Sequence, residues 1–287
     1  MDDARGAARR QRRLFRSLPT YVLLTVIGVV FAVPIVYLFV ASFAPNSQVL
    51  GGFSSINPAD LSLDNYARIF SYFTTDATGR LWQFYAVTIA VTAAVVIGGL
   101  VVNSLAGYAL ARMRWRGRNA VLLGIALVTI IPFEAVAVPL YYMLNGERNT
   151  VYVQALPFIA SAFSIFLFYT FFLDVPKEIE EAARIDGASP LRTFVSVVVP
   201  MTRPAFATVA ILTFIGQWGS YLWPVLMVSD PSVRPLVLQL GVFQSSQRPE
   251  WGSVMAFGVI FILPLLIMFL VFQRSFVASV ASSGLKG

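Results

Sequence analysis

The sequence contains neither cysteine nor histidine. Without them the chain has no disulfide framework, no thiol nucleophile and no imidazole base, and the usual zinc sites are excluded as well. Charged residues are also scarce: they make up 12% of the chain, whereas soluble domains carry about a quarter. With 57% hydrophobic residues and a mean hydropathy of +0.75, the composition predicts a membrane protein rather than a large soluble core.

Long segments with little or no charge account for this composition. We interpret six of them as membrane-spanning helices, at residues 21–43, 84–110, 120–142, 151–172, 203–227 and 251–272. At ~1.5 Å of rise per residue, the first reaches about 35 Å, which is enough to cross a bilayer with some tilt. It is too long for the apolar core of a signal peptide and is expected to be retained.

Two of these segments are expected to depart from a plain helix. The uncharged run at residues 81–111 is longer than one span needs, so its first part is expected to form a turn at the lipid surface or outside the membrane. The third span contains Pro132 and Pro139, and each is expected to break it because proline removes a helical hydrogen bond. Glu134, between these prolines, is the only acidic residue inside a predicted span.

The positions of the basic residues predict the orientation of the chain. With both termini in the cytoplasm, 16 of the 21 Lys and Arg residues fall in inner segments and five in outer loops, as the positive-inside rule requires. The fold class predicted is therefore an all-α polytopic membrane protein with six transmembrane helices. A nucleic-acid partner is not indicated by the net charge of +7, because no nucleic-acid-binding motif accompanies it.

This topology divides the chain into five parts along the sequence. They are a basic cytoplasmic tail (1–20), a first transmembrane helix (21–43), an extracytoplasmic loop (44–80), a transmembrane core (81–272) and a cytoplasmic C-terminal tail (273–287). The core includes a polar loop at 173–203, which the topology places in the cytoplasm.

The most polar stretch of the core, residues 176–200, reads PKEIEEAARIDGASPLRTFVSVVVP and predicts two short helices. Pro176 suits a first helical position, and Gly187 suits the left-handed residue that ends a helix. Ser189 followed by Pro190 is typical of an N-cap and first position of a second helix. Pro200 is expected to close the region together with Pro204.

A spaced pattern in this stretch carries a family resemblance. Seven positions match it: Glu181, Ala182, Ala183, Gly187, Val197, Val199 and Pro200. The pattern resembles the cytoplasmic coupling loop of the permease subunits of binding-protein-dependent ABC importers. The segments LSLDNYARIF at 61–70 and AGYALARMRWRGRN at 106–119 resemble the carbohydrate-uptake, maltose-system branch of that family. The resemblance implies a type I importer permease in a bacterial or archaeal cytoplasmic membrane.

The resemblance also implies how the loop functions. In the family a short helix here docks into the ATP-hydrolysing subunit, which gives coupling roles to Glu181, Ala182, Ala183, Asp186, Gly187 and Pro200. Glu181 offers a carboxylate to a cation, and the small residues allow close approach. The alternative is a plain surface helix, in which the pairs Lys177–Glu181 and Glu180–Arg184, four residues apart, stabilise the helix without any partner.

The chain carries no phosphate-binding loop of its own. Together with the coupling-loop resemblance, this implies that a separate subunit hydrolyses ATP. We expect a transport subunit that is not itself an enzyme, with no cofactor or metal in this chain and with ATP and Mg²⁺ bound by two ATPase subunits or a dimer of one. A second homologous permease, an extracytoplasmic solute-binding protein and membrane lipid complete the expected partners.

A possible substrate path is assigned to Glu134, Asn103, Gln217, Trp218 and Tyr221. Aromatic faces and a few hydrogen-bonding groups on the fifth span suit sugars. The alternatives are a packing carboxyl at Glu134, an inter-helix hydrogen bond at Asn103 and an interfacial aromatic belt at the outer end of the fifth span.

The expected function is import of a sugar, first a di- or oligosaccharide. Amino sugars and glycerol-phosphate type solutes remain alternatives, and an ion-coupled stand-alone carrier or a polytopic membrane enzyme fits less well. Few ionisable groups lie in the spans, and no His, Cys or paired carboxylates are clustered there.

Overall fold

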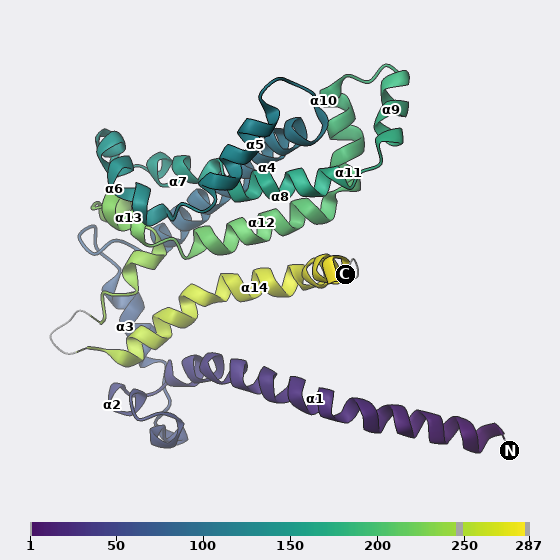
Figure 1. Cartoon of the computed structure of the whole chain (residues 1–287). Helices are drawn as coiled ribbons and strands as arrows, with labels where there is room; N and C mark the ends of the chain where they lie inside the picture. Colours follow the sequence, from purple (N-terminus) through teal and green to yellow (C-terminus); the bar gives the residue numbers. More distant parts are fainter. Residues whose placement is uncertain (1, 245–248, 285–287) are drawn as a thin grey trace. The chain divides into compact units, whose positions relative to one another are not determined.

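The computed structural model describes residues 2–244 and 249–284, with side chains at 19–244 and 249–272. All regular elements of this part of the chain are helical, as the sequence predicts (Figure 1). The chain divides into two compact units, which we describe separately. One comprises Met1–Ser71 with Leu240–Ile260, and the other Tyr72–Gln239 with Phe261–Gly287.

Three helices are long and apolar enough to cross a membrane alone. These are α1 (Asp2–Ala41), α4 (Leu81–Arg112) and α14 (Trp251–Gly284), with candidate spans at Pro19–Ala41, Leu81–Arg112 and Trp251–Phe272. Helix α4 is continuous from Leu81, so the predicted turn at its start is wrong. It contains no proline, and its first turn is held by packing of buried Phe84 on Phe73.

Three bent helix pairs correspond to the other predicted spans. They are α5 (Arg118–Val128) with α6 (Phe133–Leu144), bent by 101°; α7 (Val151–Ile159) with α8 (Ala162–Leu173), bent by 43°; and α10 to α11 (Pro190–Met201) with α12 (Arg203–Trp218), bent by 81°. Counting each pair as one span gives up to six spans, the number predicted from the sequence.

The helix breaks do not all lie at the prolines where the sequence predicts them. The third span breaks before Pro132, which has an extended backbone and precedes the first residue of α6. Pro139 lies inside α6, so the break expected there is wrong. A proline inside a membrane helix is tolerated when neighbouring groups satisfy the carbonyl that it frees. The fifth predicted span ends early, because α12 stops at Trp218 and a separate helix, α13 (Leu222–Met227), follows.

In the first unit, the segment predicted as an outer loop contains four short helical elements. These are α2 (Asn46–Val49), η1 (Phe53–Ser55), η2 (Pro58–Asp60) and α3 (Asp64–Tyr72). Buried Asn65 donates its side-chain amide to the carbonyls of Ser42 and Ala44, both at 2.9 Å. Arg68 of α3 pairs with Glu250 at 3.4 Å, so this unit is closed by polar contacts between distant parts of the sequence.

The second unit is organised around α4, which packs against α7, α8 and α12. Side chains from α4, α8 and α12 form one buried cluster that includes Tyr108, Phe168, Phe172 and Val209. A Cβ built at Gly107 would lie 2.7 Å from the Phe168 Cβ and 3.0 Å from the Tyr169 amide nitrogen. The absence of a side chain at Gly107 therefore allows the close approach of α4 to α8.

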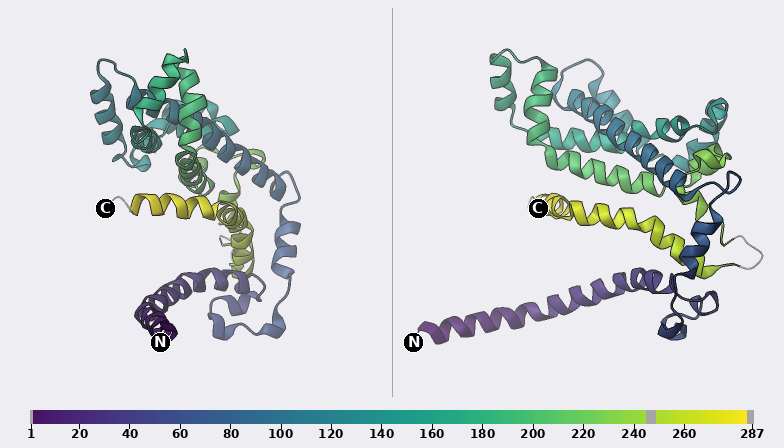
Figure 2. Two further views of the ribbon diagram at one scale, coloured as in Figure 1. Left: turned by 90° about the vertical axis from the view of Figure 1, so that its right-hand side faces the viewer. Right: turned by 180° about the vertical axis from the view of Figure 1, so that it is seen from behind.

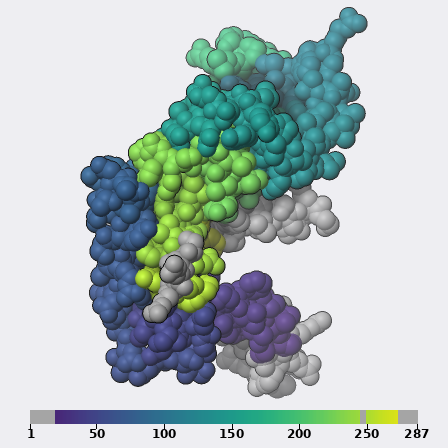
Figure 3. All heavy atoms as spheres, turned by 90° about the vertical axis from the view of Figure 1, so that its left-hand side faces the viewer, coloured from purple at the N-terminus to yellow at the C-terminus, as the bar shows by residue number. Residues whose placement is uncertain are grey.

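Helix α13 and the segment that follows it pack against the ends of α4 and α7. Trp223 donates its indole N–H to the Val153 carbonyl at 2.8 Å, and Gln154 donates to the Val233 carbonyl at 3.0 Å. The Leu236 amide donates to the Thr88 hydroxyl at 2.8 Å. The space-filling view shows the yellow-green atoms of this segment against the teal atoms of α6 and α7 (Figure 3).

We expect Gly107→Ala to lower the free energy of unfolding by about 1–3 kcal/mol, because the new methyl group overpacks the contact with Phe168. Gly124→Ala in α5 is the control, since a Cβ there meets nothing within 4 Å and alanine favours a helix by about 1 kcal/mol. Thermal unfolding of the purified chain in detergent measures both variants. Equal stability of the two would contradict the close packing.

Candidate functional site

The polar stretch after α8 forms two short helices at one end of the second unit, as predicted (Figure 2). Helix α9 (Lys177–Ile185) begins one residue after the predicted start, because Pro176 is its N-cap. Gly187 has the predicted left-handed backbone, with φ of 83°. The Ser189 hydroxyl accepts from the Arg192 amide at 3.3 Å, and Pro190 begins α10 (Pro190–Thr193), as predicted.

The chain continues from α10 as one irregular helix. A π-helical turn, η4 (Phe194–Val198), leads into α11 (Val199–Met201), and the 81° bend into α12 follows at Thr202. The Val199 amide donates to the Phe194 carbonyl five residues back, and Pro200 has no amide hydrogen to continue the α-helical pattern. Pro200 lies next to the last residue of this helix, and Pro204 lies in the first turn of α12, so the region ends between the two prolines, as predicted.

One carboxylate of α9 is buried, and it is Glu180, not Glu181. Glu180 Oε1 lies 3.0 Å from Arg112 Nε, and both side chains are only 5% exposed. The Tyr108 hydroxyl donates to the other carboxylate oxygen at 3.3 Å. Glu180 is thus held by two residues of α4, and the surface pair with Arg184 that the sequence spacing favours does not form.

Arg112 connects three elements. Besides Glu180, its guanidinium donates to the Phe172 carbonyl at 2.5 Å and to the Val175 carbonyl, at the end of α8. Removing one partner of a buried pair leaves an uncompensated charge, so such pairs are sensitive to mutation. The end of α4 therefore fixes the end of α8 and the adjoining helix α9.

Sequence reasoning missed the pairing of Arg112 with Glu180, whereas Tyr108 has the role expected of a polar residue on the second span, a hydrogen bond between helices. The only signal in the sequence was the group of arginines that begins with Arg112 at the end of the second predicted span. Such a group also occurs simply because basic residues collect on the cytoplasmic side of a membrane helix. The distance in sequence between Arg112 and Glu180 hides their contact.

The residues predicted to couple to an ATPase lie on the outer side of this anchored helix. Glu181, Ala182, Asp186 and Gly187 are exposed, and Ala183 is half-buried. Ile185 lies on the same helical face as Glu181 and is 87% exposed. The helix is thus fixed by Glu180 and exposes a mixed apolar and acidic face that includes Glu181 and Ile185.

A cavity of about 650 Å³ lies where the bent spans of the second unit break. Its walls come from the breaks at 129–132 and 160–161, from the end of α12 and from Val95 of α4. Non-helical backbone at membrane depth is tolerated where it lines a cavity or is buried in protein. The polar groups of the wall are all uncharged: Thr129, Ser161, Ser164, Thr213, Gln217 and Ser220.

Of the five predicted path residues, only Gln217 lines this cavity. Asn103 holds the break between α7 and α8 instead: its amide donates to the Ile159 carbonyl at 3.0 Å and accepts from the Ser161 amide at 2.9 Å. This is the inter-helix role that the sequence left open. Trp218 is buried and donates to the Phe261 carbonyl at 3.1 Å.

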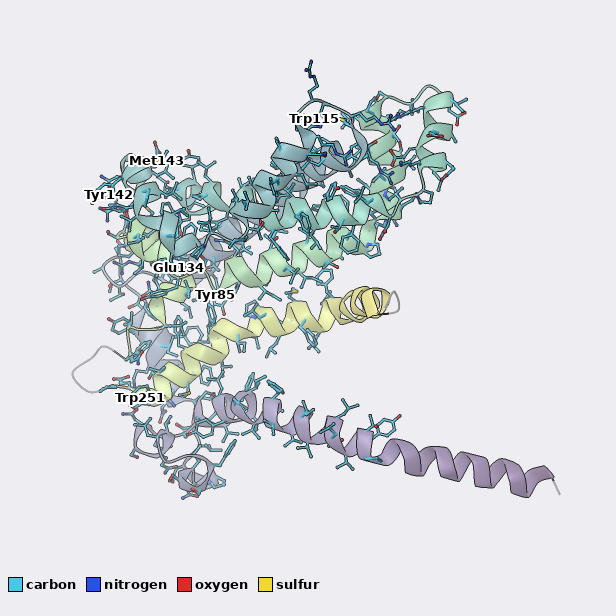
Figure 4. All side chains as sticks on the ribbon, in the orientation of Figure 1. Tyr85, Trp115, Glu134, Tyr142, Met143 and Trp251 are labelled. Carbon is cyan, nitrogen blue, oxygen red and sulfur yellow. The ribbon has the colours of Figure 1, made fainter. Side chains whose placement is uncertain are left out.

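The other two residues lie outside the cavity wall. Tyr221 follows the end of α12 and is 54% exposed. Glu134 lies in the first turn of α6 and is exposed, toward the end of the second unit opposite Trp115 (Figure 4). Neither side chain therefore contributes to the cavity in this chain.

A family model for the inner membrane component of binding-protein-dependent transport systems matches residues 103–282. The chain belongs to this family. Its members are permease subunits of ABC importers and are not themselves enzymes. The matched segment includes Arg112, the whole of α9 and the cavity wall, apart from Val95.

Several characterised relatives match most of the chain. The arabinooligosaccharides transport system permease protein AraQ of Halalkalibacterium halodurans is 31% identical over 88% of this chain and 91% of its own. The diacetylchitobiose uptake system permease protein NgcG of Streptomyces coelicolor is 31% identical over 97% and 91%. The trehalose/maltose permease MalG of Thermococcus litoralis is 29% identical over 88% and 91%.

A solved structure confirms the fold. A chain of a bacterial ABC transporter that imports the acidic polysaccharide alginate superposes with a TM-score of 0.77 and 27% identity. The match covers 92% of this chain and 97% of the other. The predicted type I importer permease architecture is thus confirmed over almost the whole length.

We expect Glu180→Ala to lower the free energy of unfolding by about 3–5 kcal/mol, because it leaves Arg112 charged and buried without a partner. Glu181→Ala is the matched control and should stay within about 0.5 kcal/mol of the parent, since that side chain is exposed. Both are measured by thermal unfolding in detergent. A larger loss in Glu181→Ala would show that the anchoring residue is misassigned.

Proposed function

We propose that this chain is one permease subunit of an ATP-driven sugar importer. Its partners are a second homologous permease, two ATPase subunits or a dimer of one, and an extracytoplasmic solute-binding protein. The observation that carries the proposal is a short helix, α9, which is fixed to the membrane-spanning helices through buried Glu180 and presents Glu181 and Ile185 outward.

The exposed face of α9 has the composition of a docking surface. Burying an isoleucine side chain such as Ile185 contributes about 1.5–3 kcal/mol, and this gain is unused while the residue is 87% exposed. Glu181 adds a carboxylate for a cation on the partner, and Ala182 allows a close approach. An ATPase subunit is the partner that the family resemblance assigns to this helix.

The contacts of α9 offer a route from docking to transport. A displacement of α9 reaches α4 and the end of α8 through Arg112, and it reaches α12 through the π turn and the bend at Thr202. These three helices also contribute Val95, Ser164 and Gln217 to the wall of the cavity. Closure of the ATPase subunits would therefore move the walls of the solute path.

The chemistry of ATP hydrolysis belongs to the partner subunits in this proposal. The sequence has no phosphate-binding loop. Among the described residues, no group of three or more His, Cys, Asp or Glu side chains is placed so that it could hold a metal ion. ATP and Mg²⁺ are accordingly assigned to the ATPase subunits.

The cavity favours an uncharged saccharide as the solute. Its hydroxyl and amide groups can exchange hydrogen bonds with sugar hydroxyls, whereas a phosphate or an ammonium group would require an opposite charge that this wall does not contribute. Relatives are named for oligosaccharides and for sn-glycerol 3-phosphate, so the cavity, rather than the relatives alone, supports a neutral di- or oligosaccharide. Amino sugars and glycerol-phosphate type solutes are the less favoured alternatives.

The membrane topology proposed is the one that the basic residues indicate, with α9 and both termini in the cytoplasm. Glu134 is exposed within a spanning segment, and a charged group is costly in lipid, so we assign it to a surface that faces the second permease or water. The side chains of the predicted basic tail before Pro19 and of the predicted C-terminal tail at 273–287 lie outside the described residues.

The importer is tested by purifying the tagged chain from its native membranes and identifying the proteins that remain bound. We expect a second permease and an ATPase subunit, with hydrolysis stimulated by a binding protein loaded with a neutral oligosaccharide. Stimulation by a glycerol-phosphate type solute instead would contradict the substrate class. Recovery of the chain alone, with uptake that follows an ion gradient, would contradict the importer.

The docking helix is tested by Glu181→Lys. We expect uptake to fall to background and the ATPase subunit to be lost on purification, because a cation then faces the cation of the partner. Membrane insertion should be unchanged, since the residue is exposed. Glu147→Lys, an equal charge change at an exposed residue of η3 (Asn145–Glu147), is the control and should transport normally. Normal uptake by Glu181→Lys would remove the docking role.

A further inference from the structure

A hollow of about 660 Å³ lies between α9 and the turn that joins α4 to α5. It is separate from the cavity at the helix breaks and shares no residue with it. Five of the residues that line it are basic: Arg112, Arg114, Arg118, Lys177 and Arg184. Neither the docking role of Glu181 nor the solute path uses this concentration of positive charge.

The acidic residues of the hollow do not balance this charge. Glu180 is paired with Arg112, and Glu181 is the one further carboxylate in the wall. Among the described residues, the ion pairs do not include Arg114, Arg118, Lys177 or Arg184. Four cations therefore line the hollow without a carboxylate within ion-pair distance.

One of these cations also has an unsatisfied buried donor. Arg118 is the first residue of α5, and its Nε is buried without any hydrogen-bond partner in the described structure. A buried N–H without an acceptor costs about 1–3 kcal/mol, so such atoms are rare unless something outside the chain accepts the hydrogen bond. An anion in the hollow would supply that acceptor.

We propose that this hollow binds a phosphate group, and that the headgroup of an anionic membrane phospholipid supplies it. Guanidinium groups match phosphate oxygens with paired N–H donors. The hollow lies where one membrane-spanning helix ends at Arg112 and the next begins at Arg118, which is the depth of lipid headgroups. Basic pockets at the cytoplasmic ends of membrane helices bind such headgroups. The assignment to the cytoplasmic leaflet rests on the proposed function.

The site would connect lipid to coupling. Lys177 and Arg184 belong to α9, whereas Arg114 lies in the turn after α4 and Arg118 begins α5. A phosphate held by both groups bridges the docking helix to the membrane-spanning helices, alongside the contact between Arg112 and Glu180. Occupancy of the hollow therefore adds a second restraint on the helix that faces the ATPase.

The test compares lipid binding by the full-length chain and two variants, using native mass spectrometry. The chain is titrated with phosphatidylglycerol or with phosphatidylcholine. We expect preferential retention of phosphatidylglycerol and a loss of about fivefold in its affinity for each arginine removed in Arg114→Gln/Arg118→Gln. Arg116→Gln is the matched control, because Arg116 lies in the same turn but does not line the hollow.

Two further measurements distinguish a lipid headgroup from free phosphate as the ligand and control for misfolding of the variants. Arg114→Lys/Arg118→Lys preserves the charge and should retain most of the preference. Binding of inorganic phosphate in phosphatidylcholine, with the same dependence on the arginines, would identify soluble phosphate as the source. Binding of phosphatidylglycerol without binding of inorganic phosphate would identify the lipid.

Three results would overturn the site. The first is equal retention of phosphatidylglycerol and phosphatidylcholine. The second is equal affinity for phosphatidylglycerol in Arg116→Gln and in Arg114→Gln/Arg118→Gln. The third is unchanged lipid binding together with loss of the ATPase subunit in the double variant alone. The last would assign the cations to an acidic partner protein. The third result is read from a separate co-purification of the double variant with the ATPase subunit. The lipid measurement itself uses this chain without ATPase or sugar, so its failure leaves the importer untouched, and failure of the importer leaves the binding result standing.

Discussion

The buried contact between Arg112 and Glu180 is the interaction on which the α9 end of the second unit depends. Helix α9 is short and polar, and it would be marginal as an isolated helix. Its position is set because one guanidinium binds its carboxylate, the Phe172 carbonyl of α8 and the Val175 carbonyl just after α8. A charged pair is costly to bury, but its directionality holds α9 in a defined orientation. The outward face of α9 follows from that orientation.

The same constraint connects the two functional regions of the second unit. A rigid contact at one end is useful to a transporter only if the other end can change shape, and the helix breaks provide that possibility. Each break frees backbone groups that lipid cannot satisfy, so the breaks must gather around a cavity or inside protein. Asn103 shows how this is done, since its amide satisfies backbone groups on both sides of the break between α7 and α8. The polar, uncharged wall of the cavity follows from the same requirement.

Much of the local structure was predictable because it depends on neighbours in sequence. Gly187, Ser189 and Pro190 mark the end of one helix and the start of the next through backbone preferences that act within a few residues. Pro139 was misjudged for the opposite reason. Whether a proline breaks a membrane helix depends on what satisfies the freed carbonyl, and that group comes from the packed structure or from a wider turn, as at η4.

By itself, the sequence determined the membrane class, up to six apolar spans, the family and the two short helices of the polar stretch, because hydropathy and spaced motifs are properties of the chain read in order. The tertiary structure decided which of two adjacent glutamates is the anchor and which is exposed, and which of five candidate residues lines the cavity. Contacts such as that between Arg112 and Glu180 join residues far apart in the chain. Their existence depends on how α4 and α8 pack, and the order of residues along the chain does not record that packing.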